Sequence, residues 1–272
     1  MNGMACMERE EARPRRFVGG FTLLELLVVV AIISVLASLL LPALAKGKAQ
    51  GTSASCKNHL RQLGLALEMY VEQNRHQYPN EKTMLWFDAL LPYYPLQWTN
   101  PAYHCPGYKG GISLFAGSLP HDPLGSYAYN GRGVENYDSL SPLYIKGLVS
   151  LGLDGSQKGD SSAISQFQVI APGEMLAIGE SRHRGERDVS NDSGVFQMYC
   201  GNIQGPPVPF MNWYYGNPPL PERHGKNYNQ LFCDGHVVAM NPRIFFNPTN
   251  SASLWNNDHQ PHPELWVGLN LY

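Results

Sequence analysis

The chain has 272 residues, 43% hydrophobic and 15% charged, so it holds enough apolar mass for one large domain or two small ones. A formal charge of −2 gives no sign of a nucleic-acid partner. With 27 glycines, 21 prolines and 15 tyrosines, the composition favours a loop-rich, partly β protein and argues against a purely helical bundle.

An apolar run near the N-terminus predicts a membrane-spanning helix over about 21–44. The run holds only four polar side chains: Thr22, Glu25, Ser34 and Ser38. A helix of this length spans roughly 36 Å, more than the hydrocarbon core of a bilayer, which is about 30 Å thick. Three arginines precede the run, so the positive-inside rule predicts a cytoplasmic N-terminus: Arg13, Arg15 and Arg16.

Two ordinary interpretations of this run compete. One is a plain signal anchor, and the other is a secretory signal cleaved after Ala45, at the A-x-A-like sequence Ala43-Leu44-Ala45. The apolar core of a secretory signal is usually about 7–15 residues long, and this run is longer. Neither interpretation explains Glu25. A carboxylate costs on the order of 2.5–3.5 kcal/mol at the centre of a membrane helix, and less near its start.

Cleavage after Gly20 would supply a partner for this carboxylate. The new N-terminal amine would belong to Phe21, which lies four residues from Glu25 and therefore on the same helix face. In an assembly of such helices, the carboxylate of one subunit can neutralise the amine of the next.

The segment "GGFTLLELLVV", residues 19–29, resembles the type IV prepilin (class III) signal of pilins and of type II secretion pseudopilins. The resemblance implies that a prepilin peptidase cleaves after Gly20 and N-methylates Phe21. It also implies that Glu25 guides the docking of subunits into a helical filament. Pro42 matches a proline that is common in the family's helix.

A helical pattern continues beyond this run. Pro42 removes one backbone hydrogen bond and predicts a bend near 38–42, and Gly47 and Gly51 mark a weak stretch. Leu60, Leu63 and Leu67 then form an apolar stripe at helical spacing. We therefore predict one long helix, from 21 to about 74, whose outer half packs this stripe against a globular head. A separate short helix would show the same stripe.

The remainder, 75–272, predicts an α+β head with an antiparallel sheet. We expect a short helix over 83–91, ordered loops with short strands over 92–168 and a buried strand at 174–181. An extended loop is expected over 201–221, and an irregular tail from Pro242. Asp234-Gly235 predicts a two-residue type I′ hairpin that pairs Phe232 with Val237.

His224, Asp234 and Gly235 resemble the C-terminal H-x9-D-G element of one branch of pseudopilin-like proteins. The segments "CKNHL" from Cys56, "HCPG" at 104–107 and "SYAYNGRG" at 126–133 resemble further pieces of that branch. We expect a structural role, in which Asp234 and Gly235 make the turn and His224 caps a loop or bonds a backbone carbonyl.

Four cysteines follow the apolar run: Cys56, Cys105, Cys200 and Cys233. Outside the cytoplasm they can form disulfides, and three pairings are possible. Cys56–Cys105 is preferred, followed by Cys200–Cys233, with free buried thiols as the alternative.

No cofactor is expected. The resemblance offers calcium as an alternative, since major secretion-type pseudopilins often hold calcium in a C-terminal loop, but only Asp188 and Asp192 stand close together in a loop here. A weaker hypothesis is a metal or ligand site drawn from Asp234, His236, Glu180 or His183. His259 and His262 are expected in a solvated loop.

The expected protein is a single-pass inner-membrane pseudopilin and not an enzyme, with a leader (1–20), a spine helix (21–74) and an extracytoplasmic head (75–272). The resemblance gives a prepilin peptidase and other pseudopilins as partners. The alternative is a membrane-anchored head that binds a ligand such as a glycan through aromatic loops: Trp86, Trp98, Trp213, Tyr214 and Tyr215. A third possibility is an enzyme released after Ala45, although no hydrolase motif is present.

Overall fold

The structure, a computed structural model, describes residues 21–80, 84–112, 125–131, 133–135, 152–153, 163–180, 198–199, 223–225, 227–245 and 248–263. The chain divides into two compact units, which we call the N-terminal unit (Met1–Ala45) and the C-terminal unit (Lys46–Tyr272). The predicted loop at 201–221 lies outside the described residues.

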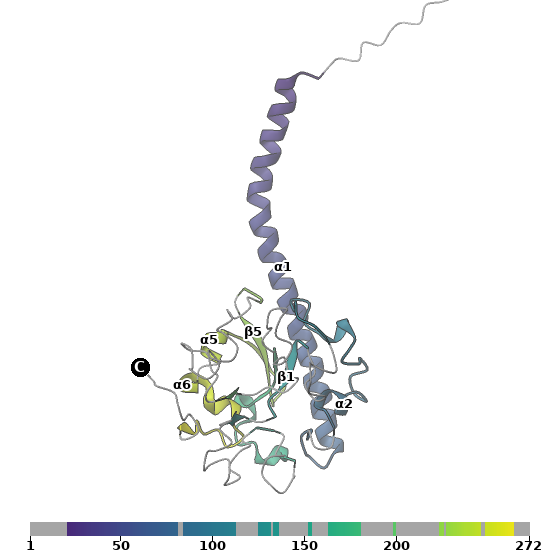
Figure 1. The fold of residues 1–272 in the computed structure, drawn as a ribbon, viewed down its shortest axis with the longest axis vertical. Helices are drawn as coiled ribbons and strands as arrows, with labels where there is room; N and C mark the ends of the chain where they lie inside the picture. Colours follow the sequence, from purple (N-terminus) through teal and green to yellow (C-terminus); the bar gives the residue numbers. More distant parts are fainter. Residues whose placement is uncertain are drawn as a thin grey trace, which may run out of the picture. The chain divides into compact units, whose positions relative to one another are not determined.

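Helix α1 runs from Leu23 to Gln73 without interruption, through Pro42 and both glycines (Figure 1). This confirms the prediction of one long helix, and a separate second helix is not formed. The bend at Pro42 stays a prediction. Just after the helix, Arg75 and His76 have left-handed backbone, and the His76 N–H donates back to the Val71 carbonyl at 2.9 Å.

In the N-terminal unit the large apolar side chains of α1 are exposed, from Leu23 at 81% to Leu44 at 70%. The helix is long and apolar enough to cross a membrane by length and composition. The hydroxyl of Ser34 donates to the Val30 carbonyl and that of Ser38 to the Val35 carbonyl, both at 2.7 Å. These bonds satisfy the hydroxyls within the helix, as a hydrocarbon environment requires.

The C-terminal unit contains a four-stranded antiparallel sheet in the order β1-β3-β5-β6. Its strands are β1 (Tyr127–Tyr129), β3 (Leu176–Glu180), β5 (Tyr228–Phe232) and β6 (Val237–Met240). Strands β2 (Val134–Glu135) and β4 (Met198–Tyr199) form a separate parallel pair. The predicted α+β class with an antiparallel sheet is therefore confirmed, and β3 falls within the predicted strand.

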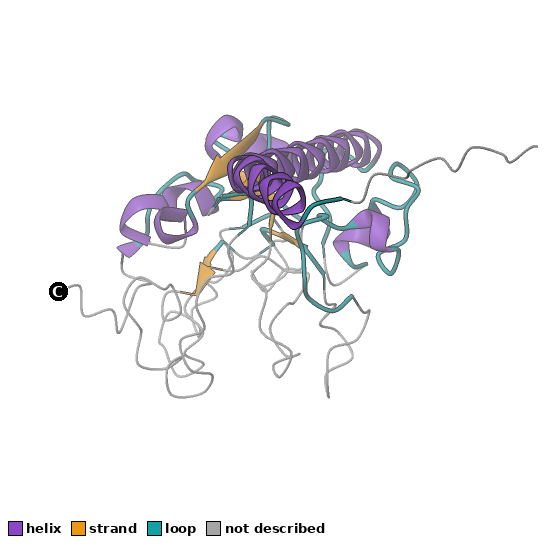
Figure 2. Ribbon diagram, turned by 90° about the horizontal axis from the view of Figure 1, so that it is seen from above, coloured by secondary structure: helices purple, strands orange, loops and turns teal. Residues whose placement is uncertain are grey.

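The part of α1 in the C-terminal unit lies against this sheet (Figure 2). The predicted stripe is buried, with Leu60 and Leu63 at 0% exposure and Leu67 at 4%. A Cβ at Gly64 would lie 2.9 Å from Leu231 Cδ1, so the absence of a side chain lets the helix approach β5 closely.

A cluster of aromatic rings, some stacked and some edge-to-face, forms part of the core. Trp86 and Phe87 come from α2 (Trp86–Ala89), which lies inside the predicted helix 83–91, and Tyr103 comes from η1 (Pro101–Tyr103). The Phe87 and Trp98 rings stack with centroids 4.4 Å apart, and both side chains are buried. These aromatic residues belong to the same hydrophobic core as the α1 leucines and the strand residues.

The hairpin of β5 and β6 differs from the predicted one by one position. Leu231 pairs with Val237, and the Phe232 N–H donates to the His236 carbonyl at 3.0 Å. The loop therefore has three residues, and the Gly235 N–H closes a turn on the Phe232 carbonyl at 3.0 Å. Only Gly235 (φ 87°) has left-handed backbone there, whereas a type I′ turn requires it at Asp234 as well.

The prediction of an irregular tail from Pro242 is wrong. Short helices follow at α5 (Pro242–Phe245), α6 (Pro248–Ser251) and η4 (Ala252–Trp255), and proline opens the first two. Phe245 and Trp255 are fully buried, with ring centroids 4.7 Å apart. Two more one-turn helices, η2 (Gln166–Gln168) and η3 (Pro172–Glu174), precede β3.

We predict that Gly64→Leu lowers the unfolding free energy of the full-length chain by about 1–3 kcal/mol, because the new side chain overpacks against Leu231. Gly51→Leu is the matched control, since a Cβ there meets no atom within 4 Å. Denaturant unfolding of both variants in the same detergent measures the difference. Equal stabilities would contradict the close packing of α1 on β5.

Candidate functional site

The start of α1 is the first feature with functional potential. The Thr22 N–H and hydroxyl donate to Glu25 Oε2 at 2.9 and 2.8 Å, and the Glu25 N–H donates to Thr22 Oγ1 at 3.3 Å. These bonds form a capping box, which satisfies free donors in the first turn of a helix. This role of Glu25 is additional to the predicted one, and its sequence signal is Thr-x-x-Glu before an apolar run.

The capping box uses only one oxygen of the Glu25 carboxylate. Among the described residues, Oε1 of Glu25 has no hydrogen-bond partner. Phe21 stands beside this helix start and is 71% exposed, and Gly20 lies outside the described residues. The carboxylate is therefore held in place by its own helix and keeps one oxygen for another group.

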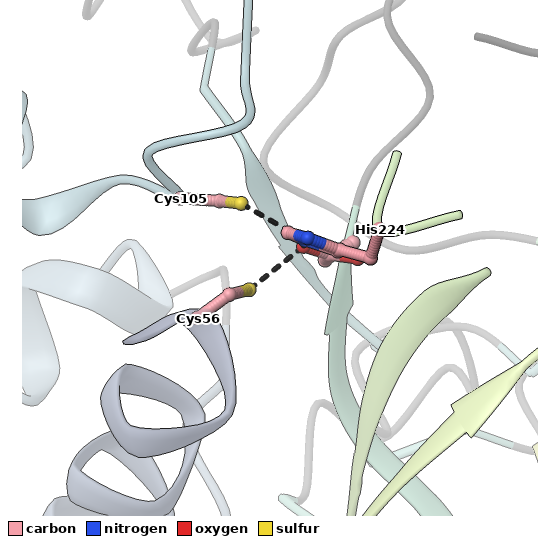
Figure 3. A group of neighbouring side chains, drawn as sticks. Cys56, Cys105 and His224 are labelled. Atoms are coloured by element: carbon pink, nitrogen blue, oxygen red, sulfur yellow. Dashed lines mark hydrogen bonds and ion pairs between the residues drawn. The ribbon is translucent and has the colours of Figure 1, made fainter. Parts of the chain in front are cut away.

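The second feature is a buried cluster of four side chains, which we call the Cys-Cys-Glu-His cluster: Cys56, Cys105, Glu180 and His224. Figure 3 shows how Cys56, Cys105 and His224 point toward one another. Glu180 Oε1 lies 2.7 Å from both Cys56 Sγ and His224 Nε2. The same His224 nitrogen lies 3.2 Å from Cys105 Sγ. One ligand-type atom from each residue lies within 4.8 Å of the other three, so the four side chains converge on one point.

Four separate segments bring these residues together. Cys56 comes from α1, Cys105 from the loop after η1, Glu180 from the end of β3 and His224 from the turn before β5. His224 and Gly225 both have left-handed backbone, with φ of 45° and 72°. This conformation is uncommon for a residue with a side chain, and such residues persist only where their surroundings hold them.

Neighbouring groups hold the cluster in place. The Asn229 N–H donates to Glu180 Oε2 at 2.7 Å, the Gly107 N–H donates to Cys105 Sγ at 3.3 Å, and the Tyr127 hydroxyl lies 3.3 Å from Cys56 Sγ. Arg223, also buried, places its guanidinium over the Tyr108 ring at 4.8 Å. All of these groups lie in the C-terminal unit.

The Cys-Cys-Glu-His cluster brings ionisable side chains together in a buried environment, which shifts their pKa values. Burial raises the pKa of the Glu180 carboxyl, but the His224 hydrogen bond and the Arg223 charge outweigh it, so the net pKa is lowered. Burial lowers the pKa of His224, but bonding to Cys105 and Glu180 raises it to about 9. Contact with Cys56 brings the pKa of the Cys105 thiol down to about 7, although burial opposes this.

The geometry differs from that of a catalytic Cys-His-acid triad. In a triad the two ring nitrogens of histidine serve different partners, whereas here Nε2 of His224 faces both Cys105 and Glu180. The Cys56, Cys105 and Glu180 side chains are buried, and the His224 side chain is only 1% exposed. Four donor atoms converging in the core are suited to holding a small ion or a proton network.

Several site predictions from the sequence need correction. His224 neither caps a loop nor bonds a backbone carbonyl, because its ring contacts Glu180 and Cys105 instead. Cys56 and Cys105 do come together, but as free thiols and not as the preferred disulfide. Cys233 is also a free thiol, and its predicted partner Cys200 lies outside the described residues.

The sequence hypothesis of a metal or ligand site named Asp234, His236, Glu180 or His183, and of these the structure places only Glu180 in the Cys-Cys-Glu-His cluster. Asp234 and His236 pair with each other at the half-exposed hairpin turn, while Glu180 is buried in the Cys-Cys-Glu-His cluster. The suggested residues His183, Asp188 and Asp192 lie outside the described residues. His259 bonds Glu174 at 2.9 Å and His262 bonds Asp258 at 2.7 Å, so each has a local acidic partner.

The aromatic residues of the glycan-binding alternative fall into two groups. Trp86 and Trp98 are 1% and 2% exposed and pack on each other, so they belong to the core. Trp213, Tyr214 and Tyr215 lie outside the described residues.

Known proteins resemble this chain at its N-terminus and beyond. The family described as the prokaryotic N-terminal methylation motif matches residues 15–41. Type II secretion system core protein G of Pseudomonas aeruginosa is 31% identical over 143 residues, which cover 46% of this chain and 99% of that protein. The core protein G of Aeromonas hydrophila is 32% identical over 148 residues, covering 54% of this chain and 90% of that protein.

The core protein G of Escherichia coli K12 is 36% identical over 124 residues, covering 45% of this chain and 79% of that protein. No solved structure shows a significant match to the chain. The H-x9-D-G element is not tested by these similarities and stays a resemblance. Because the P. aeruginosa protein is matched over nearly its whole length, the chain belongs to the family of type II secretion core G proteins, the pseudopilins.

Proposed function

We propose that this pseudopilin is made as a precursor whose leader, residues 1–20, is removed by a prepilin peptidase after Gly20. The peptidase then N-methylates Phe21, and the mature subunit packs with other pseudopilins into a filament of a type II secretion or related pilus-like machine. The spine helix is residues 21–74 and the head is residues 75–272. The match of the methylation motif to residues 15–41 supports the processing step.

The carboxylate of Glu25 is the observation on which the assembly step depends. It stands in an apolar helix, is fixed by Thr22 through Oε2, and keeps Oε1 unpartnered among the described residues. After cleavage the nearest cation of a neighbouring subunit would be the amine of its Phe21. Pairing the two charges removes the cost of leaving either one alone in lipid.

The exposed apolar side chains of the N-terminal unit support the same proposal. Among the described residues nothing buries these side chains, so lipid and neighbouring helices are the surfaces that can cover them. The three arginines before the run support a cytoplasmic N-terminus, by the positive-inside rule. The head then lies outside the inner membrane, and its role is structural rather than enzymatic.

We predict that the mature chain isolated from membranes begins at an N-methylated Phe21. Mass spectrometry of the N-terminal peptide measures both the cleavage site and the added methyl group. Deleting the prepilin peptidase is the control, and it should leave the chain starting at its leader. A mature chain that begins at Lys46 would contradict the proposal and favour secretory cleavage.

We predict that Glu25→Gln lowers incorporation into filaments at least about tenfold, because the charge is lost while the amide oxygen can still accept from Thr22. Thr22→Ala is the matched control, since it weakens the helix cap but keeps the carboxylate, and incorporation should stay near wild type. Cross-linking between subunits in membranes, normalised to the amount of cleaved chain, measures both. Incorporation that stays near wild type in Glu25→Gln but falls in Thr22→Ala would show that Glu25 acts only as a cap.

A further inference from the structure

We propose that the Cys-Cys-Glu-His cluster is a structural zinc site, in which Cys56 Sγ, Cys105 Sγ, Glu180 Oε1 and His224 Nε2 are the four ligand atoms. The site would tie α1 to the loop after η1, to β3 and to the turn before β5. This inference concerns the C-terminal unit alone and does not depend on filament assembly.

The spacing of the four atoms suits a tetrahedral ion. Zinc bonds of about 2.3 Å to sulfur and 2.0–2.2 Å to nitrogen and oxygen place ligand atoms roughly 3.3–3.8 Å apart. The measured contacts are 2.7, 2.7 and 3.2 Å, and no pair exceeds 4.8 Å. Replacing the shared protons by an ion therefore requires the ligands to move by only about half an ångström to one ångström.

The chemistry of the donor set selects zinc over calcium and magnesium. Two thiols and one imidazole are soft or borderline ligands, and hard cations instead prefer six or more oxygens. All four positions are supplied by the protein, and the side chains are buried. A closed tetrahedral set without an open position is typical of structural sites and not of catalytic ones.

Charge balance supplies an independent observation. On binding zinc, Cys56 and Cys105 would lose their thiol protons and His224 would bind as the neutral ring, so the protons pass to solvent. Two thiolates and the Glu180 carboxylate then exceed the charge of the ion by one. Arg223 is 4% exposed, its charge acts on Glu180, and it makes no hydrogen bond through Nη1 or Nη2 within the described residues. It supplies the balancing positive charge.

The surroundings of the cluster resemble an outer shell that orients metal ligands. The Asn229 N–H binds Oε2 of Glu180 and leaves Oε1 turned toward the cluster. The Gly107 N–H points at Cys105 Sγ, and the Tyr127 hydroxyl is next to Cys56 Sγ. Donors aimed at sulfur favour the thiolate form that a metal requires. A Cβ at Gly107 would lie 3.3 Å from the His224 ring, so the backbone packs tightly on this ligand.

The test is the zinc content of the full-length wild-type chain, purified in detergent from membranes without added metal. Inductively coupled plasma mass spectrometry should find about one zinc per chain. After removal by a chelator, titration with zinc sulfate alone should restore one equivalent. Peptide mapping of the same sample under non-reducing conditions reports the state of Cys56 and Cys105, which should not be joined to each other.

Matched variants assign the ligands. His224→Ala and Cys105→Ser should each lower zinc content at least tenfold. His236→Ala and Cys233→Ser should keep it, because these residues lie at the hairpin turn and outside the cluster. Wild-type chain with less than a tenth of an equivalent of zinc before and after titration would overturn the proposal, whether its thiols are free or joined in a Cys56–Cys105 disulfide. That measurement does not depend on any variant folding.

Discussion

The buried carboxylate of Glu180 is the constraint around which the C-terminal unit is arranged. A charge with 0% exposure is tolerated only when both of its oxygens have partners. Here one oxygen accepts from the backbone of β5, and the other meets Cys56 from α1 and His224 from the turn before β5. The position of α1 on the sheet and the approach of the chain to β5 are therefore coupled through one side chain.

The two parts of helix α1 present different surfaces, one buried against the sheet and one exposed and apolar. Within the C-terminal unit it buries a leucine stripe and, at Gly64, its own backbone against the sheet. Within the N-terminal unit it exposes apolar side chains and satisfies its serine hydroxyls internally. Glu25 stands at the start of this apolar half, where the capping box orients it. One sequence element thus joins a membrane-type surface to a core-type surface, which is what a filament subunit with a helical spine requires.

Much of this architecture could be predicted from the sequence because its patterns are local. The apolar run, the Leu60/Leu63/Leu67 stripe and the strand that includes Glu180 depend on periodicity within one segment. The hairpin register could not be predicted as surely, because Asp-Gly suits both a two-residue turn and a three-residue turn with a left-handed glycine. Which of the two turns forms depends on the backbone conformation of Asp234, and an aspartate can adopt either one. In the tail, Pro242 and Pro248 were helix-start signals that went unused.

The Cys-Cys-Glu-His cluster was missed for a different reason. Its members come from segments far apart in the chain, so no spacing rule joins them, and the cysteines were interpreted as disulfide partners. A usable signal did exist: three of the segments that resemble the H-x9-D-G branch each carry one ligand-type residue of the cluster, namely Cys56, Cys105 and His224. Regarding such segments as parts of one site would have brought these three together before the structure did.

The convergence of Cys56 and Cys105 on one ion beside Glu180 is tested most directly by X-ray absorption spectroscopy at the zinc edge of the full-length chain in detergent. A four-ligand shell of two sulfurs at about 2.3 Å and two nitrogen or oxygen atoms at about 2.0 Å is the expected result. A shell of nitrogen and oxygen only, or a shell with a single sulfur, would contradict the assignment of Cys56 and Cys105 as joint ligands.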